Sequence, residues 1–271
     1  MIAALRWIPF VYSVELRKAL AYRIDFWVQV IASVITEMVI VYFLWQAIYA
    51  SRGTTEMGGF TFGAIMLYYL LAHITSKVLH GPDFGFMSVE IYEGSLTRYL
   101  VYPVSFHGYK LAAYLAKSSV AILQLFVLLI AYLSIFGQPE GVTLVPSSLL
   151  MGVVAIVSAT CLYFSIAAIL ETVAFWADNV WSLAVMLRFA TALLGGALIP
   201  LTLFPESAQR VLAWLPFAYL IKFPVETMMG RHGLIDWLLG LGVCTLWTAV
   251  FLAIGWYVWR RGLKQYSGVG V

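Results

Sequence analysis

The segment "LAAYLAKSSVAILQLFVLLIAYLSIF" (residues 111–136) decides the fold of this chain. It exceeds the about 20 mostly apolar residues that an α-helix needs to cross the hydrocarbon core of a bilayer. Its charged residue, Lys117, lies toward one end of the segment, where water and lipid headgroups reduce the cost of a charge. The segment therefore predicts a membrane-spanning helix.

Five more stretches meet the same criterion: residues 24–49, 60–78, 147–170, 181–203 and 235–259. The 271 residues are 63% hydrophobic and 11% charged, with a mean hydropathy of +0.92, whereas a soluble domain carries about a quarter charged residues. The gaps between the six stretches leave no room for a folded soluble domain. The sequence predicts an all-α integral membrane fold with six transmembrane helices.

The distribution of Lys and Arg predicts the orientation, because these residues are enriched in cytoplasmic loops. With both termini in the cytoplasm, all but four of the 16 Lys and Arg residues lie on the inner side. The four exceptions are Arg52, Arg210, Lys222 and Arg231. We expect a multi-pass protein of the plasma (inner) membrane with cytoplasmic N and C termini. The net charge of +3 is small, and no basic stripe indicates a nucleic-acid partner.

Residues 1–23 precede the first span and predict an N-terminal amphipathic interfacial helix. Apolar residues that can share one helical face are Trp7, Phe10, Val11, Val14 and Ala21, whereas Glu15, Arg17 and Lys18 point elsewhere. Aromatic and basic residues in such a segment favour a helix that lies in the plane of the membrane surface. The alternative is a simple lead-in to the first span. Residues 24–271 then form the six-span membrane domain.

The segment before the last span, "GGALIPLTLFPESAQRVLAWLPFAYLIKFPVETMMG" (residues 195–230), is apolar but interrupted by glycine and proline. Broken helices at membrane depth are tolerated where protein covers them. We expect two short re-entrant helices in the outer leaflet, at about residues 204–230, with Pro205 opening the first and Pro216 and Pro224 bracketing the second. An ordinary extracellular loop is the alternative, and apolar residues such as Val211 and Trp214 argue against it.

Few residues in the chain suggest chemistry. There is no G-x-x-x-x-G-K-[ST] sequence, so the chain carries no phosphate-binding loop of that type, and no catalytic or metal-binding residues are predicted. His73 and His80 lack nearby carboxylates at ligand spacing, and packing or hydrogen bonding is the expected role. Glu37 lies about halfway along the first span, where a charge is costly. It either contacts substrate or a partner helix, or it makes a hydrogen bond inside the bundle.

The polar segment "SVEIYEGSLTRYLVYPVSFHGYK" (residues 88–110) interrupts the chain between the second and third spans. Ser88 is a candidate N-cap, and acids in the first turns favour a helix. We expect one short amphipathic helix at about residues 88–102, ended by Pro103. This helix would present Glu90, Tyr92, Glu93 and Arg98 to the cytosol. The alternative is a packed connector with no partner.

Two segments resemble ABC-2 type transporter permeases. The cytoplasmic loop of that family is matched by Glu93, Gly94, Leu96, Leu100, Pro103 and Val104. The family's region before the last span is matched by Gly196, Pro200, Pro205, Leu215, Pro216 and Gly230. The number of spans and the basic inner termini fit the same family, so the resemblance covers nearly the whole chain.

The resemblance implies the membrane subunit of an ATP-driven exporter. Such a permease pairs with a second copy or a similar paralogue and binds two ABC ATPase subunits, which hold ATP and Mg, so this chain itself is expected to be no enzyme and to need no cofactor. Cargo would be amphipathic or lipidic, in contact with membrane lipid. The coupling residues implied are Glu90, Tyr92, Glu93, Gly94, Leu96 and Arg98. Glu37, Tyr42, Trp45, Phe62 and Pro200 are candidates for the substrate path or the dimer interface.

Two other functions remain as alternatives. A proton- or ion-coupled secondary carrier would need Glu37 to titrate during transport. A non-transporting scaffold subunit would need no titratable or coupling residue. An integral-membrane enzyme is disfavoured because no polar residues cluster at one membrane depth. Association with an ATPase distinguishes the exporter from these alternatives.

Overall fold

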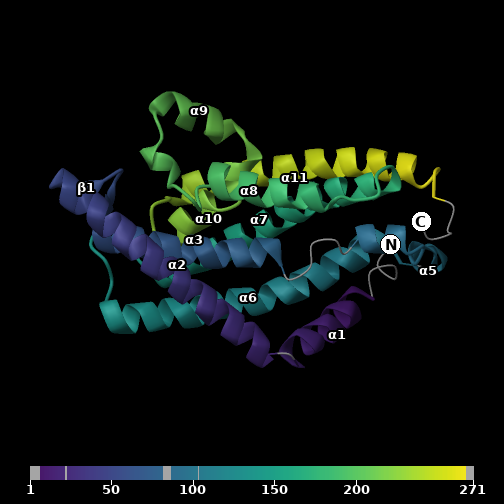
Figure 1. The fold of residues 1–271 in the computed structure, drawn as a ribbon, viewed down its shortest axis with the longest axis horizontal. Helices are drawn as coiled ribbons and strands as arrows, with labels where there is room; N and C mark the ends of the chain where they lie inside the picture. The colour runs from purple at the N-terminus through teal and green to yellow at the C-terminus, as the bar shows by residue number, and fades with distance from the viewer. Residues whose placement is uncertain (1–6, 22, 82–86, 103, 267–271) are drawn as a thin grey trace.

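A computed structural model describes residues 7–21, 23–81, 87–102 and 104–266. These residues form an elongated, mostly helical bundle whose long helices lie side by side (Figure 1). Pro103 lies outside this description, as do residues 1–6 and 22 of the expected N-terminal helix and residues 82–86 and 267–271 of the expected membrane domain. The expected all-α membrane fold is confirmed in outline, apart from one small β-hairpin.

Five helices are long and apolar enough to cross a membrane. They are α2 (Arg23–Arg52), α3 (Phe62–His80), α6 (Phe106–Phe136), α7 (Pro146–Thr172) and α11 (Leu234–Gly262). Each contains almost all of a span expected from the sequence. Local signals set their ends: the hydroxyl of Ser105 accepts a hydrogen bond from the Gly108 N–H at 3.3 Å to begin α6, and Gly137, with φ of +73°, ends it. Both features are common at helix termini.

The two ends of the bundle differ in their elements. A two-stranded antiparallel hairpin, β1 (Glu56–Met57) and β2 (Phe60–Thr61), lies at one end, together with α9 (Glu206–Trp214) (Figure 1). The short helices α4 (Ser88–Tyr92) and α5 (Leu96–Val101) lie at the opposite end, beside the C-terminal end of α11 (Figure 1). The placement of this second end in the cytoplasm rests on the distribution of Lys and Arg.

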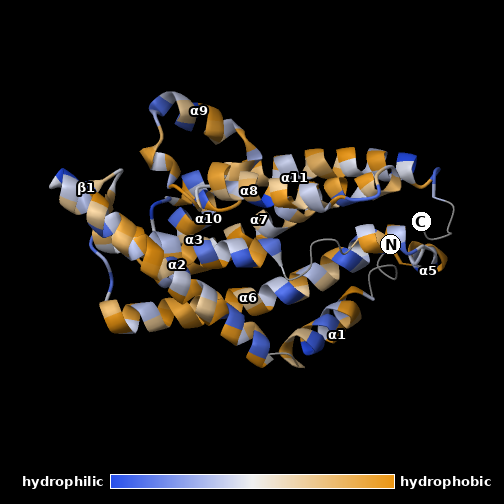
Figure 2. Ribbon diagram, viewed as in Figure 1, coloured by the Kyte–Doolittle hydropathy of each residue, from blue (hydrophilic) through white to orange (hydrophobic). Residues whose placement is uncertain are grey.

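Helix α3 forms the centre of the bundle. It packs against α2, α6, α7 and α10 (Lys222–Met228), and its side chains from Ile65 to Leu71 are almost all fully buried. The outer faces of α2 and α11 are apolar and exposed instead, as Figure 2 shows. A lipid environment suits such surfaces, because water would penalise so much exposed apolar area.

The expected fifth span, residues 181–203, is wrong in its second half. Helix α8 (Trp181–Leu194) has 14 residues, which gives about 21 Å of helix against about 30 Å of hydrocarbon core. The chain turns at Gly195, where a Cβ would meet the carbonyl oxygen of Phe217 at 3.1 Å. Gly196 then adopts φ of +93°, and the carbonyl of Gly195 accepts a hydrogen bond from the Lys222 N–H at 2.9 Å. The count of six spans therefore stays a prediction.

The segment before α11 consists of short helices, as expected. After the 3-10 turn η3 (Leu201–Leu203), α9 begins behind Pro205, and the 3-10 turn η4 (Pro216–Tyr219) leads into α10. The chain bends by 79° between α9 and the η4–α10 unit. Pro224 lies inside α10 rather than at its border, which corrects the expected boundary. Helix α10 is buried against α7, whereas α9 is peripheral, with Trp214 among the most exposed large side chains.

Helix α1 (Ile8–Ala21) packs along α6. The hydroxyls of Tyr12 and Ser119 lie 2.7 Å apart, and Glu15 faces the protein, where it pairs with Lys18 at 2.7 Å. Phe10 and Val14 are exposed. Trp7 instead packs on Gly108 of α6, and Arg17 and Lys18 are exposed as well, so the interfacial placement of α1 stays a prediction.

Packing of α10 on α7 depends on a glycine. A Cβ on Gly152 of α7 would meet the Met228 side chain and lie 3.3 Å from its Cα, so we expect Gly152→Val to destabilise the protein by about 1–3 kcal/mol through overpacking. Gly242 of α11 has open space around its Cβ position, and Gly242→Val is the matched control. Thermal unfolding of the purified protein in detergent measures both; equal melting temperatures would contradict the α7–α10 packing.

Candidate functional site

The polar segment between α3 and α6 forms two short helices rather than one. α4 has five residues and α5 has six, and the turn between them contains Gly94 at φ of +69°, a conformation that glycine adopts at little cost. The single helix expected over residues 88–102 is therefore wrong. Ser88 is also not the N-cap. Met87 occupies that position, and its side chain makes no capping hydrogen bond to the helix.

A carboxylate from α7 caps α4 instead. Glu171 Oε2 accepts hydrogen bonds from the backbone N–H groups of Met87, at 2.5 Å, and Ser88, at 3.2 Å. The unpaired N–H groups of a first helical turn favour a negative charge, and charge-assisted hydrogen bonds are stronger than neutral ones. Because Glu171 is buried near the end of α7, this contact fixes α4 to a long helix of the bundle.

A second carboxylate, Glu90, holds α4, α5 and α6 together. Its Oε1 lies 3.0 Å from Lys110 Nζ, and both side chains are largely buried. It also accepts hydrogen bonds from the hydroxyls of Ser95 and Tyr99, and Arg98 lies 3.4 Å from its Oε2. One buried carboxylate thus joins the start of α6 to both short helices.

These contacts determine the protonation of Glu90 and Tyr99. Burial by itself raises the pKa of Glu90, but the hydrogen bonds from Ser95 and Lys110 outweigh it, so the pKa lies below its ordinary value of 4.5. Burial, the Glu90 charge and the hydrogen bond to it raise the pKa of Tyr99 to about 12. At neutral pH Glu90 is therefore a carboxylate and Tyr99 a hydrogen-bond donor.

The C-terminal end of the described chain contacts the same turn. The Tyr266 hydroxyl donates to the Gly94 carbonyl at 2.6 Å and accepts from the Thr97 N–H at 3.1 Å. Phe106 and Trp259 stack with ring centroids 5.1 Å apart, within a cluster that also includes residues of α4, α5 and α7. The α4–α5 unit is therefore attached to α6, α7 and the segment after α11.

The six predicted coupling residues differ in their exposure. Glu93 and Arg98 are exposed, whereas Leu96 is buried, and Glu90, Tyr92 and Gly94 are half-buried. The Tyr92 hydroxyl donates to the Ala177 carbonyl at 3.2 Å. Exposed apolar side chains accompany the exposed charges: Val89, Leu100, Val101 and Tyr102. An outward surface of mixed apolar and charged character remains available for contact with another protein.

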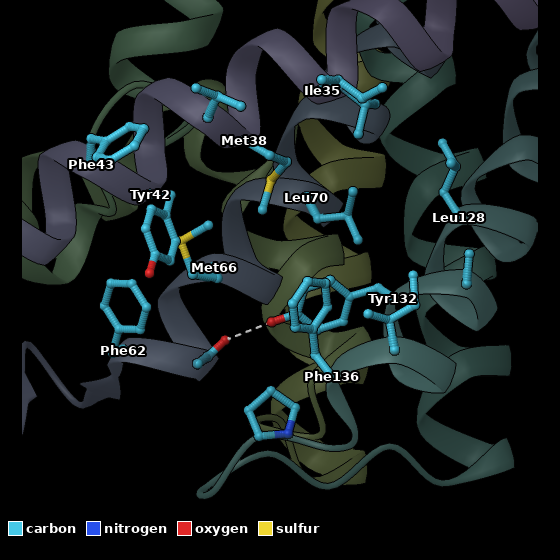
Figure 3. Close-up of a pocket in the computed structure, with 16 residues that line it drawn as sticks. Ile35, Met38, Tyr42, Phe43, Phe62, Met66, Leu70, Leu128, Tyr132 and Phe136 are labelled. Atoms are coloured by element: carbon cyan, nitrogen blue, oxygen red, sulfur yellow. Dashed lines mark hydrogen bonds between the residues drawn. The ribbon is translucent and has the colours of Figure 1, made fainter.

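A separate cavity of about 770 Å³ lies between α2, α3 and α6. Its lining is nearly all apolar, and Figure 3 shows the side chains of the three helices directed toward a common space. Within the lining, the Tyr132 hydroxyl of α6 donates a hydrogen bond to the Gly63 carbonyl of α3 at 3.3 Å (Figure 3). A cavity of this size and lining fits a small apolar or amphipathic molecule.

Only part of the predicted substrate path lines this cavity. Tyr42 and Phe62 both do, with ring centroids 5.5 Å apart in an edge-to-face contact. Trp45 is buried against Tyr49 and Tyr69, and Pro200 is buried between α8 and η3, so neither lines it. Tyr42 and Phe62 are the predicted residues best placed for cargo.

Glu37 lines neither this cavity nor the core. It is half-exposed, with its Oε2 4.0 Å from His73 Nδ1, and His73 Nε2 lies 3.1 Å from Ser33 Oγ. The hydroxyl of the neighbouring Thr36 donates to the Ala32 carbonyl at 2.9 Å. His80 lies against the Tyr163 ring at 5.3 Å. The two histidines thus have separate neighbours.

Sequence reasoning missed three residues of the α4–α5 attachment: Glu171 as a cap, Lys110 as a buried partner, and Tyr266. A charge at the end of an apolar helix was the visible signal for Glu171 and Lys110. Nothing in the sequence indicates that Tyr266 contacts a turn that lies far away along the chain.

One comparison with known proteins finds a match. The family model described as "ABC-2 family transporter protein" matches residues 35–270. No curated protein and no solved structure matches the chain. The family match covers most of the chain, including α3 to α11 and the α4–α5 unit, and agrees with the membrane-helix composition of the fold. The chain belongs to the ABC-2 family of transporter proteins and is a multi-pass membrane permease.

Proposed function

We propose that the chain is the membrane subunit of an ABC exporter and that a separate ATPase docks on the α4–α5 unit. The observation that carries the proposal is the attachment of this short unit to several long elements at once. Glu171 joins it to α7, Lys110 joins it to α6, and Tyr266 joins it to the segment after α11. A displacement of α4–α5 would therefore be transmitted to the ends of these helices, because packed elements move as bodies.

The exposed side of the unit has the composition of a protein interface. Leu100, Val101 and Tyr102 supply apolar area, and Glu93 and Arg98 supply opposite charges close by. Apolar residues surrounded by polar ones are typical of the centre and rim of a contact between proteins. Two ATPases on a pair of permeases would each take one such surface.

The proposed cargo follows from the cavity between α2, α3 and α6. Its apolar lining and its position at the outer surface of the bundle suit an amphipathic or lipidic molecule that enters from the membrane. ATP-driven closure of the partner would move α6 relative to its neighbours and change this cavity. Export across the plasma membrane is the direction that the family resemblance favours.

The docking proposal is tested by a charge placed in the apolar part of the surface. Val101 is 77% exposed, so Val101→Asp does not disturb the core, and we expect it to weaken ATPase binding by at least about tenfold because a charge would be buried at the interface. Co-purification of ABC ATPase subunits with the tagged permease, from detergent extracts of the cells that produce it naturally, is the measurement. Val211→Asp on α9, where the side chain is 62% exposed at the opposite end, is the control.

Loss of the ATPase with Val101→Asp but not with Val211→Asp supports the proposal. An ATPase that is retained in both variants would contradict the assigned surface. Transport that continues in vesicles without any ATPase would contradict the exporter itself.

A proton-coupled carrier is the second candidate function, favoured by the titratable pair Glu37 and His73 in the middle of α2 and α3. In a carrier, substrate movement would follow an imposed proton gradient in vesicles that contain the permease alone. The same vesicles serve the ATPase test, so one preparation distinguishes the two functions.

A further inference from the structure

A carboxylate and an imidazole meet between the middle parts of α2 and α3. Glu37 lies at the midpoint of the 30-residue helix α2, and its Oε2 is 4.0 Å from Nδ1 of His73 on α3. The Glu37 side chain is 38% exposed and the His73 side chain 16%. A charged group at this depth of a bilayer is costly and generally faces a polar partner or water. Both side chains can therefore be reached by a polar group from outside this chain.

The hydrogen bonds of Ser33 determine which nitrogen of His73 carries a hydrogen. The Ser33 hydroxyl donates its single hydrogen to the Val30 carbonyl at 2.9 Å. Its oxygen also lies 3.1 Å from His73 Nε2, so Nε2 is the donor in that contact, because a hydroxyl has only one hydrogen to give. In the neutral imidazole the other nitrogen, Nδ1, is then an acceptor. It is this nitrogen that faces Glu37.

Two hydrogen-bond acceptors thus point toward the same space. His73 Nδ1 and the carboxylate oxygen of Glu37 each present a lone pair, and at 4.0 Å they make no hydrogen bond to each other. A donor nitrogen about 2.9 Å from both atoms fits between them. Among the ion pairs of the described residues, only this one includes Glu37. No lysine or arginine in the described part of the chain supplies the donor.

We propose that Glu37 and His73 bind the protonated amine of an amphiphile. A primary or secondary ammonium group has at least two N–H donors, one for each acceptor, and its charge compensates the carboxylate. Water would supply the donors without the charge, and a quaternary ammonium group would supply the charge without the donors. Binding requires the permease alone, and the inference rests on the proposed function only where this ligand is named as cargo.

The surface beside Glu37 suits the apolar part of such a ligand. Ile40 and Leu44 lie on the same face of α2, at the spacing of successive helical turns, and they are 60% and 51% exposed. An apolar chain attached to the ammonium group can lie along them, and it offsets the cost of bringing a charge into the membrane. The site is separate from the cavity between α2, α3 and α6, whose lining includes neither Glu37 nor His73.

The binding test uses the full chain, purified in a neutral detergent. The probe is a dansyl group joined by a dodecyl chain to a primary amine, and its fluorescence anisotropy is followed. We expect dodecylamine to displace the probe. Dodecyltrimethylammonium has the same chain and charge but no N–H group, and dodecanol has a hydroxyl donor but no charge, so both should compete much more weakly. Methylammonium, which lacks the chain, should compete only at far higher concentration.

Two variants remove the acceptors one at a time. Glu37→Gln and His73→Leu should each weaken binding of the probe at least about tenfold, the value of one charged hydrogen bond. Glu206→Gln makes the first substitution at an exposed acid of α9 and should leave binding unchanged. Thermal unfolding in the same detergent identifies any variant that does not fold, and the comparison of ligands on the unaltered chain needs no variant.

Several results would overturn the inference. Dodecyltrimethylammonium that competes as well as dodecylamine would show that the acceptors recognise no N–H group. Dodecanol that competes equally would show that charge is irrelevant, and methylammonium that competes equally would rule out an amphiphile. Folded Glu37→Gln and His73→Leu proteins that bind the probe normally would place the amine elsewhere.

The role of the amine as cargo is tested with the ABC ATPase added. Stimulation of ATP hydrolysis by dodecylamine, and not by dodecyltrimethylammonium, supports that role, whereas binding without stimulation would contradict it. If no ATPase associates while the order of ligands holds, the proposed function fails and the amine site stands. If the ATPase associates and the order of ligands does not hold, only the amine site fails.

Discussion

Replacing Glu171 with alanine is expected to uncouple ATP hydrolysis from transport. The variant leaves the N–H groups of Met87 and Ser88 without their carboxylate acceptor and should weaken the attachment of α4 to α7 by about 2–4 kcal/mol. The ATPase would still dock on the exposed side of α4–α5, but its movement would no longer reach α7. We expect ATP hydrolysis by the complex to continue while export per ATP falls.

Two measurements check this expectation. Hydrogen exchange at Met87 and Ser88 should accelerate about 30-fold or more, as a loss of 2 kcal/mol of local stability implies. Transport and ATP hydrolysis are measured together in vesicles. Asp178→Ala, an exposed acid in the loop before α8, is the control and should change neither. If hydrogen exchange accelerates in Glu171→Ala while export stays normal, α4 can detach from α7 without loss of transport. That result would contradict the proposal that movement of the ATPase is transmitted from α4 to α7.

Removing Lys110 is expected to cause the largest loss of stability. Its ammonium group lies 3.0 Å from Glu90, and its side chain is 4% exposed, so Lys110→Met leaves a largely buried carboxylate without its closest cation. Breaking a buried ion pair from one side costs about 3–5 kcal/mol. Unfolding of the purified permease in detergent measures the change. Lys264→Met makes the same substitution at an exposed position and should be close to neutral.

A double-mutant cycle separates this pair from other effects. Because Glu90→Gln removes the charge that Lys110 compensates, we expect the double variant to lose less stability than the sum of the two single variants. Additive losses would show that the pair is not coupled. Such a result would contradict the arrangement in which Glu90 joins α4, α5 and α6.

The same carboxylate predicts a pH dependence. The folded-state pKa of Glu90 lies below its ordinary value of 4.5, so its stabilising contribution is complete above about pH 4.5 and is lost as the pH falls through the lowered pKa. The wild-type protein should therefore lose stability below pH 4.5 more steeply than Glu90→Gln does.

Much of the fold follows from local patterns in the sequence. Apolar length set the positions of α2, α3, α6, α7 and α11 to within a few residues at most ends, because each such helix must satisfy its own backbone hydrogen bonds in a bilayer. Pro205 and Pro216 marked the starts of α9 and η4 for a similarly local reason. The "MGGF" hairpin at residues 57–60 was overlooked, although Gly58 and Gly59 both adopt positive φ, and paired glycines are a recognised signal for such a turn.

Other features depend on distant parts of the chain. Apolar composition alone extended the fifth span to residue 203, but α8 stops at Leu194 because Gly195 and Gly196 turn the backbone against η4 and the start of α10. Ser88 looked like an N-cap, yet Glu171 performs that role from 83 residues away along the chain. Trp45 and Tyr42 are close in sequence, but only Tyr42 faces the cavity.

The sequence by itself determined the class of protein, its long apolar helices, the predicted orientation and the family resemblance that the family match confirms. These properties depend on the composition of the chain, on the length of its apolar segments and on the positions of its charges. Each can be read from one segment at a time, because a bilayer requires every spanning segment to be apolar along its own length. Only the tertiary structure decided which carboxylates attach α4–α5 to the bundle, and which of the aromatic side chains of α2 line the apolar cavity. Such contacts join residues far apart in the chain, and their energies depend on distances and burial that no single segment contains.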